Sequence, residues 1–303
     1  MNAQQLVEVG DVELCVETFG DPDRPTLLLV SGAAASMDWW DTELCERLAG
    51  GGRYVVRYDH RDTGRSTTGT PGHPSYDGWQ LGRDCAALIE ALGRGPVHLV
   101  GISLGGGIGQ LIALRHPELL ASLTLVSTSA TAGVDSRSLP GPTARASASF
   151  ETPPPEPDWS DPESYADWVV AGSRAFTGTL PFDEPRVRAV ATTVHARSSD
   201  PAAAGNHWLV VGADDDADDA DEPLDVRRIT TPTLVLHGSE DPLFPLPHGR
   251  ALAAAIPAAT LLVLDGVGHE VPPPSTWDLV VPALLRHTAG TLRDDETAAH
   301  HKP

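Results

Sequence analysis

The chain has 303 residues, of which 41% are hydrophobic, enough to bury the core of one large α/β domain or of two smaller domains. Its formal net charge of −21 argues against nucleic acid as a partner, because the phosphate backbone attracts basic surfaces. No apolar run approaches the roughly 18 residues of a spanning helix, and the first residues carry neither the basic nor the apolar stretch of a secretion signal, so we expect no membrane association.

Apolar runs rich in β-branched residues predict strands, and they lie at 12–19, 26–30, 54–58, 97–100, 123–127, 233–236 and 260–264. Helical patterns fall between them, at about 41–48, 79–92, 106–115, 248–255 and 276–287. Continuous apolar strands that alternate with helices are typical of a parallel sheet covered on both faces. The sequence therefore predicts an α/β fold with a mostly parallel sheet.

The alternation stops between residues 130 and 228, where three prolines at 153–155 are followed by helical pieces around 165–176 and 185–197. We expect residues 130–228 to form a mainly helical cap, inserted into a core made of residues 1–129 and 229–290. The acidic run at 214–222 is expected to be a solvated loop, with attraction of a cationic substrate as the alternative. Residues 291–303 are expected to be a frayed, flexible tail.

The pentapeptide Gly-Ile-Ser-Leu-Gly at 101–105 follows a predicted strand and precedes a predicted helix. This setting is typical of the nucleophile elbow, a turn too tight for side chains at the positions that flank the serine. The turn exposes the hydroxyl at the N-terminus of the next helix, which stabilises developing negative charge. We therefore predict that Ser103 is a nucleophile, the alternative being an ordinary strand-to-helix turn.

A serine hydroxyl needs a base, and the base needs an acid to orient it. After an elbow of this kind the acid comes next in the chain and the histidine last, each on a loop that follows a strand. Asp241 follows the predicted strand at 233–236, so we predict that it is the acid. A turn-forming role before Pro242 is one alternative, and Glu240 is the rival acid.

His269 follows the predicted strand at 260–264 and is preceded by glycine, so we predict that it is the base. A histidine on a surface loop is the alternative. His60 and His237 also end strands, but both precede the position at which this chain order requires the base. We expect them to give hydrogen-bonding support.

An oxyanion hole needs two backbone N–H groups. One is expected from Leu104, which follows the nucleophile. The other is expected from the small-residue loop after the strand at 26–30, where Ala33 is the best candidate donor.

With these motifs in order, residues 10–290 resemble the α/β-hydrolase superfamily. The segment 57–66 resembles the strand and loop that follow the oxyanion strand in that superfamily. In finer detail, including Asp-Pro at 241–242 and the proline after the histidine loop, the chain resembles the aclacinomycin methylesterases, which hydrolyse a carboxylic methyl ester of anthracycline polyketides. The resemblance implies a triad of Ser103, Asp241 and His269, and an oxyanion hole of Ala33 and Leu104.

The chain departs from the superfamily pattern in two places. Ser31 stands where the oxyanion loop usually begins with histidine, which leaves the backbone donor in place but changes the support of the loop. The cap diverges further, and its aromatic residues are expected either to shape the substrate pocket or to pack in the cap's own core; they are Trp159, Trp168, Phe176, Phe182 and Trp208.

We therefore expect a serine hydrolase of a small-molecule carboxylic ester, a methyl ester of a polyketide-type metabolite, that needs no cofactor and no metal. The alternatives are a non-hydrolytic, cofactor-free tailoring enzyme (a cyclase, lyase or oxygenase) and a ligand-binding receptor on the same fold. A haloalkane dehalogenase is disfavoured because the elbow carries serine in place of aspartate. Three cysteines without a CxxC spacing indicate reduced thiols and a cytoplasmic protein.

Overall fold

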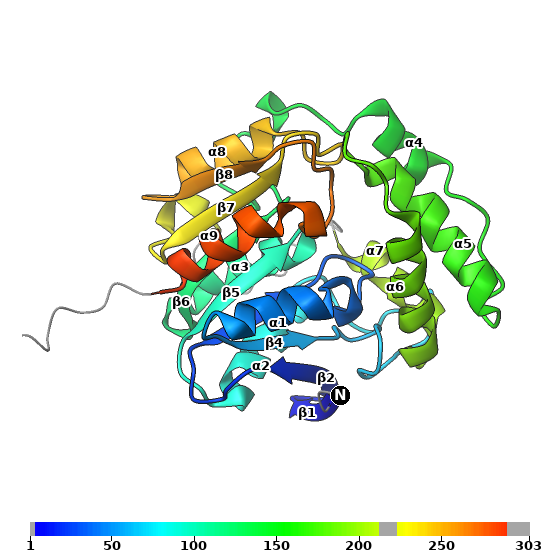
Figure 1. Ribbon diagram of the computed structural model, residues 1–303, viewed down its shortest axis with the longest axis horizontal. Coiled ribbons are helices and arrows are strands. Elements are labelled where there is room, and N and C mark those ends of the chain that lie inside the picture. The colour runs from blue at the N-terminus through cyan, green and yellow to red at the C-terminus, as the bar shows by residue number, and fades with distance from the viewer. Residues whose placement is uncertain (1–3, 212–222, 290–303) are drawn as a thin grey trace, which may run out of the picture.

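The computed structural model describes residues 4–211 and 223–289 of the chain (Figure 1). Eight strands in this part form a single sheet. The strands are β1 (Gln4–Val9), β2 (Val12–Phe19), β3 (Thr26–Val30), β4 (Tyr54–Tyr58), β5 (Val97–Ile102), β6 (Leu120–Val126), β7 (Thr233–Gly238) and β8 (Thr260–Leu264).

The spatial order of the sheet is β1-β2-β4-β3-β5-β6-β7-β8. The pairs β1–β2 and β2–β4 are antiparallel, and every pair from β4 to β8 is parallel. Because parallel strands end at the same edge of a sheet, the loops after β3, β4, β5, β7 and β8 all leave from one edge. That edge carries every residue that the sequence predicts to be catalytic.

Helices cover both faces of the sheet, as the apolar strands require. On one face α2, α3 and α8 pack against Leu28, Val56 and Leu99 of the strands, and on the other α1 and α9 pack against Leu29 and Val100. The helices are α1 (Thr42–Gly50), α2 (Gln80–Leu92), α3 (Leu104–Arg115), α4 (Ala144–Glu151), α5 (Pro162–Ser173), α6 (Glu184–Arg197), α7 (Asn206–Val210), α8 (Pro247–Ala255) and α9 (Trp277–His287).

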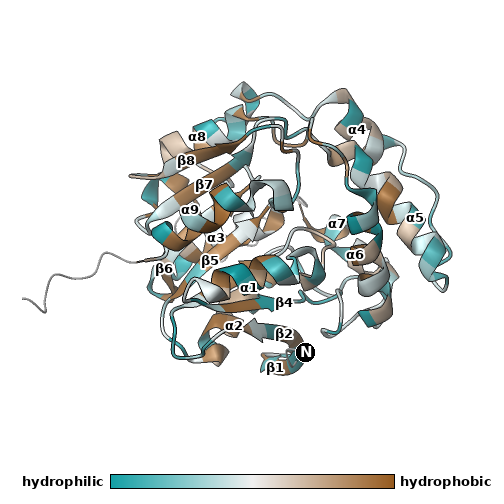
Figure 2. Ribbon diagram, viewed as in Figure 1, coloured by the Kyte–Doolittle hydropathy of each residue, from teal (hydrophilic) through white to brown (hydrophobic). Residues whose placement is uncertain are grey.

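Helices α4 to α7 interrupt the alternation between β6 and β7, and Figure 1 shows them gathered beside the sheet. They share a small core of their own, centred on Tyr165, Ala166, Ala191 and Val194. In Figure 2 the strands are mainly brown, whereas α5 and α6 mix teal with brown. The insertion thus has much less apolar surface to bury than the sheet.

Ion pairs join the insertion to the sheet core. Arg197, at the end of α6, pairs with Asp38 and with Asp59, and the distance from its Nη2 to Asp59 Oδ2 is 2.6 Å. The Asp59 side chain is fully buried, so the arginine neutralises a carboxylate that would otherwise be costly to bury. A second pair, between Arg186 of α6 and Asp41, lies nearer to the surface.

The strands at 12–19, 26–30, 54–58 and 260–264 have the bounds that the sequence predicts. The structure adds β1, which the sequence pattern did not indicate, because this edge strand buries only Val9. It also adds the short helices α4 and α7. The acidic run at 214–222 and the tail at 291–303 lie outside the described residues, so those two predictions stay untested.

Candidate active site

Ser103 lies in the turn between β5 and α3 with φ 53° and ψ −117°, a backbone conformation that residues with side chains rarely adopt. The turn is held by its own backbone, since Gly106 and Gly107 donate to the Ser103 carbonyl and the Ser103 N–H donates to Val126. A Cβ atom at Gly101 would meet the backbone of residue 105, which is why the turn needs glycine there. Strain of this kind marks functional sites.

His269 and Asp241 form a hydrogen-bonded pair, with 2.9 Å between His269 Nδ1 and Asp241 Oδ2 and 3.2 Å to Oδ1. The Asp241 carboxylate is itself held by the backbone N–H groups of Leu243 and Phe244, each 2.9 Å from Oδ1. Glu240, the rival acid, has an exposed side chain. The Asp241 carboxylate can therefore fix the histidine with Nδ1 protonated and Nε2 free to accept a proton.

The Asp241 carboxyl stays ionised in this setting. Burial acts to raise its pKa, but the hydrogen bond and charge of His269 and the N–H of Phe244 outweigh burial and hold the pKa below its ordinary value. The ionised form is the one that can stabilise a positive charge on the His269 ring.

The oxyanion loop lies against the elbow. A Cβ atom at Gly32 would be 3.5 Å from Ser103 Cβ, so the loop and the serine are neighbours. Among the described residues, the N–H groups of Ala33 and Leu104 have no hydrogen-bond acceptor. Two free N–H groups, one in this loop and one directly after the serine, are what an oxyanion hole requires.

The two histidines expected to give support do make hydrogen bonds to backbone carbonyls. His60 Nε2 is 3.1 Å from the Ser31 carbonyl at the start of the oxyanion loop. His237 Nε2 is 2.7 Å from the Phe244 carbonyl, in the turn that also holds Asp241. Both rings therefore brace the loops that carry the candidate site.

The insertion also supports the histidine loop, which the sequence did not indicate. The His269 N–H donates to the Phe176 carbonyl at 2.8 Å, and Thr179 and Leu180 both donate to the Gly266 carbonyl. Phe176 ends the short 3-10 helix Arg174–Phe176 after α5. These backbone hydrogen bonds hold residues 176–180 of the insertion beside the loop that carries His269.

The aromatic residues of the insertion divide into two groups. Trp159 and Trp168 pack against Tyr165 in the core of the insertion, and Phe182 lies under Arg174. By contrast, rings form a chain of contacts that runs from the exposed surface to the candidate base. Its members are Trp208, Phe150, Phe176, His269 and Phe244, with ring centroids 5.6–6.2 Å apart.

Phe150 was not singled out by the sequence, because it stands alone in the Ala- and Ser-rich α4. Phe150 and Trp208 are 48% and 53% exposed, unusual for rings of this size.

The structure brings Asp241 and His269 together and places Ser103 on the same edge of the sheet, where β5 ends. Within the described residues no hydrogen bond joins the Ser103 hydroxyl to His269, so the direct serine–histidine contact stays a prediction. Such bonds are commonly long without substrate and tighten in the reacting complex.

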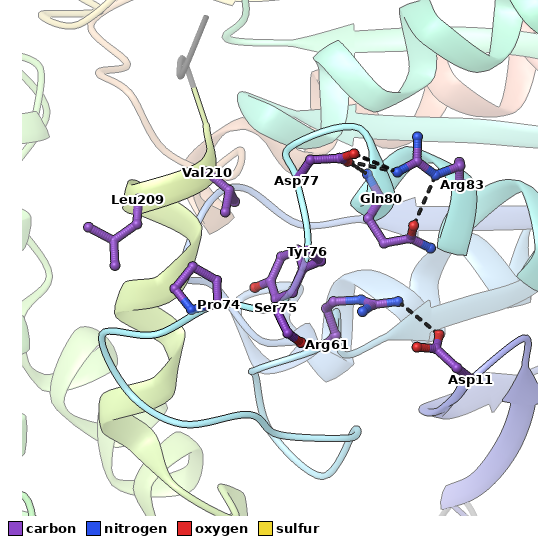
Figure 3. Close-up of a pocket in the computed structure, with 10 residues that line it drawn as sticks. All are labelled: Asp11, Arg61, Pro74, Ser75, Tyr76, Asp77, Gln80, Arg83, Leu209 and Val210. Atoms are coloured by element: carbon purple, nitrogen blue, oxygen red, sulfur yellow. Dashed lines mark hydrogen bonds and ion pairs between the residues drawn. The ribbon is translucent and has the colours of Figure 1, made fainter. Parts of the chain in front are cut away.

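A cavity of about 700 Å³ lies apart from these residues, between α7 and the loop that leads into α2 (Figure 3). Its cations are already neutralised, since Arg61 pairs with Asp11 and Arg83 pairs with Asp77. Tyr76 completes one wall. No member of the candidate triad lines this cavity, so it is separate from the candidate active site.

Among the described residues, no cluster of three or more His, Cys, Asp or Glu side chains could hold a metal ion. None of the helices in this part of the chain is both long enough and apolar enough to span a membrane.

The sheet order, the elbow and the paired aspartate and histidine define an α/β hydrolase. A family model for the alpha/beta hydrolase fold matches residues 25–274, and the chain belongs to this family. Two rhodomycin D methylesterases, one from a Streptomyces strain and one from Streptomyces peucetius, are 34% and 33% identical to it, over 94% of this chain and 97% of each relative. The structure of the enol-lactonase from Burkholderia xenovorans superposes on this chain with a TM-score of 0.69 and 22% sequence identity. The match covers 94% of this chain and 100% of the enol-lactonase chain, so the two share a fold.

Proposed function

We propose that this protein is a serine carboxylic-ester hydrolase that removes the methyl group from a methyl ester of a polyketide-type metabolite. Ser103 is the nucleophile, His269 the base and Asp241 the orienting acid, with Ala33 and Leu104 as oxyanion donors. The observation that carries the proposal is the His269–Asp241 pair at the sheet edge where Ser103 occupies its strained turn. The methylesterase relatives, which align with nearly the whole chain, support the choice of ester.

The mechanism follows from the direction of each hydrogen bond. His269 Nδ1–H donates to Asp241, so Nε2 takes the proton as the Ser103 oxygen attacks the ester carbonyl. The carbonyl oxygen becomes negative and is stabilised by two N–H groups, that of Ala33 in the loop after β3 and that of Leu104 at the N-terminus of α3. His269 then protonates the methoxy oxygen as its bond to the carbonyl carbon breaks, which releases methanol. In the second half the same ring takes a proton from a water that attacks the acyl carbonyl, and returns it to the Ser103 oxygen as the acid departs.

The proposed cap comprises residues 130–228, of which 212–222 are outside the described residues. It would bind the bulk of the substrate. Contacts of Phe176 with the His269 ring, together with exposed Phe150 and Trp208, support a planar aromatic acyl group, because rings stack favourably at these spacings. The acyl group would extend from the base toward the exposed rings.

We also propose that the protein acts in the cytoplasm on a small molecule, without nucleic acid or membrane partners. Cys15, Cys45 and Cys85 are all buried and unpaired, which supports a reducing compartment.

Labelling with a small fluorophosphonate tests the proposal. We expect one adduct, located on Ser103 by peptide mass, that is absent in Ser103→Ala. The labelled enzyme should lose its ability to release methanol from methyl esters of aromatic polyketides. Labelling without ester turnover would favour a non-hydrolytic tailoring enzyme, and no labelling would contradict an activated serine.

A further inference from the structure

His207 of α7 connects the insertion to the oxyanion loop. The backbone N–H of Ala34 donates to His207 Nδ1 over 2.9 Å, and His207 Nε2 lies 2.9 Å from the Arg61 carbonyl. The His207 side chain is completely buried. Its neighbour Asn206 holds α7 in place, since its amide donates to Asp62 and accepts from Gly72.

The two partners settle which nitrogen of His207 carries the proton. The Arg61 carbonyl can only accept, so Nε2 must be the donor, and Nδ1 must be unprotonated to accept from Ala34. Burial lowers the pKa of His207 below its ordinary value, against the opposing effects of the Arg61 carbonyl and the Asp62 charge. The ring is therefore neutral at neutral pH, as this pair of bonds requires.

The oxyanion loop is braced from two sides. From the sheet core, His60 bonds the Ser31 carbonyl, and from the insertion, His207 bonds the Ala34 N–H. The His60 and His207 rings also meet edge to face, with centroids 5.8 Å apart. Ala34 has a left-handed φ of 57°, so the loop needs an outside partner to hold this conformation beside Ala33.

We propose that His207 is a positioning residue for the oxyanion hole. Through its hydrogen bond to Ala34 it fixes the direction of the Ala33 N–H, so the rate of acyl transfer depends on how α7 of the insertion packs against the oxyanion loop. This inference rests on the proposed function. The link has no counterpart in the local sequence, because residues 34 and 207 are 173 positions apart.

Two substitutions separate positioning from simple anchoring. In His207→Asn the side-chain oxygen can replace Nδ1 as the acceptor for Ala34, whereas in His207→Gln the amide can replace Nε2 as the donor to Arg61 but leaves Ala34 unpaired. His195→Gln is the matched control, since His195 bonds the Trp159 carbonyl inside the insertion. Turnover of p-nitrophenyl acetate and thermal unfolding are measured for all three.

We expect His207→Gln to lower kcat about 10- to 100-fold with little change in KM, because an oxyanion donor acts on the transition state. His207→Asn should keep kcat within about threefold of the wild type, and His195→Gln should be unchanged. Equal losses in both His207 variants would overturn the proposal in favour of a general anchor, and so would a wild-type kcat in His207→Gln.

Hydrogen exchange at the Ala34 amide separates this proposal from the ester hydrolase function. If the wild type cleaves neither p-nitrophenyl acetate nor methyl esters, the proposed function fails. The exchange rate of the Ala34 amide in the wild type then still shows whether the Ala34–His207 hydrogen bond forms. The same measurement serves if His207→Gln does not fold. Slow exchange in the wild type supports the link, and fast exchange overturns it.

Discussion

The sheet core and the inserted helices differ in how much of each element they bury. Every residue of β3 and β5 is buried, whereas α4 buries only Ala146 and α6 buries three of its 14 residues. The core is positioned by apolar packing, whereas the insertion is joined to it largely by ion pairs and hydrogen bonds, with Leu180 as an apolar contact. The elbow that carries Ser103 is thus part of the apolar core, while the proposed cap is held by contacts that single substitutions can remove.

The largest effect is expected when the proposed nucleophile in the sheet core is substituted. Ser103→Ala should lose about 10⁴-fold or more in kcat, because the remaining triad residues act as a unit with the serine. The fold should survive, as the Ser103 hydroxyl makes no hydrogen bond among the described residues. Ester hydrolysis and thermal unfolding check both parts, and retention of more than about a tenth of the activity would contradict the assignment.

The acid gives the next largest effect. Asp241→Asn should lose about 10³- to 10⁴-fold in kcat, because an amide favours the wrong tautomer of His269. Glu240→Gln is the matched control and should stay near the wild type, since its side chain is exposed. Steady-state hydrolysis decides between them, and the reverse pattern would move the acid to Glu240.

Cutting the insertion's ion pairs tests the other side of the comparison. Arg197→Gln should lower the free energy of unfolding by about 3–5 kcal/mol, because it leaves Asp59 buried without its partner. Arg186→Gln is the control and should cost less than Arg197→Gln, since the Asp41 side chain is 19% exposed whereas that of Asp59 is fully buried. Urea unfolding measures the free energy of unfolding of both variants. Equal losses would show that burial of the carboxylate does not determine how much each ion pair stabilises the protein.

The exposed rings of the insertion should affect the binding of a large aromatic substrate and not the turnover of a small ester. Trp208→Ala is expected to raise KM for a polycyclic aromatic methyl ester about tenfold, a loss of about 1.4 kcal/mol of stacking and burial, while kcat for p-nitrophenyl acetate is unchanged. Leu209→Ala, a neighbouring exposed apolar residue, is the control. A parallel loss on both substrates would assign Trp208 a structural role instead.

The last prediction concerns pH and the buried histidine His60 of the sheet core. Burial lowers the pKa of His60 to about 3, so the folded state binds its proton at lower pH than the unfolded state, whose pKa is about 6.5. Stability should therefore fall as the pH drops from about 6.5 toward 3. His60→Gln keeps the donor to Ser31 and should reduce this slope by up to about 1.4 kcal/mol per pH unit. Urea unfolding of the wild type and of His60→Gln at pH 7 and 5 is the measurement. The same dependence of stability on pH in both proteins would contradict the low pKa of His60.

Sequence reasoning identified the core because burial leaves a pattern in the chain. The runs at 26–30 and 54–58 are apolar throughout or nearly so, and the structure places strands with those bounds. The same approach missed β1, an edge strand in which only Val9 is buried, and α4, which is rich in Ala and Ser. A pattern search finds an element only when the element has a buried face.

The candidate triad was predictable from local context, because each member follows a strand of the same parallel sheet. The contacts made by His207 and Phe176 were not, since they join residues far apart in the chain through single hydrogen bonds. No periodicity records such a bond. The aromatic residues illustrate the same limit: Trp159 and Trp168 pack inside the insertion, and only the fold shows that Trp208 does not.

The backbone bonds between residues 176–180 and the His269 loop have a consequence for folding. The histidine loop follows β8, whereas residues 176–180, which hydrogen-bond to it, precede β7, so the loop gains these bonds only when both parts of the chain have come together. Contacts of such sequence separation form late, after the local βα units. We therefore expect the geometry around His269 to be completed late in folding, when the insertion docks against the sheet core.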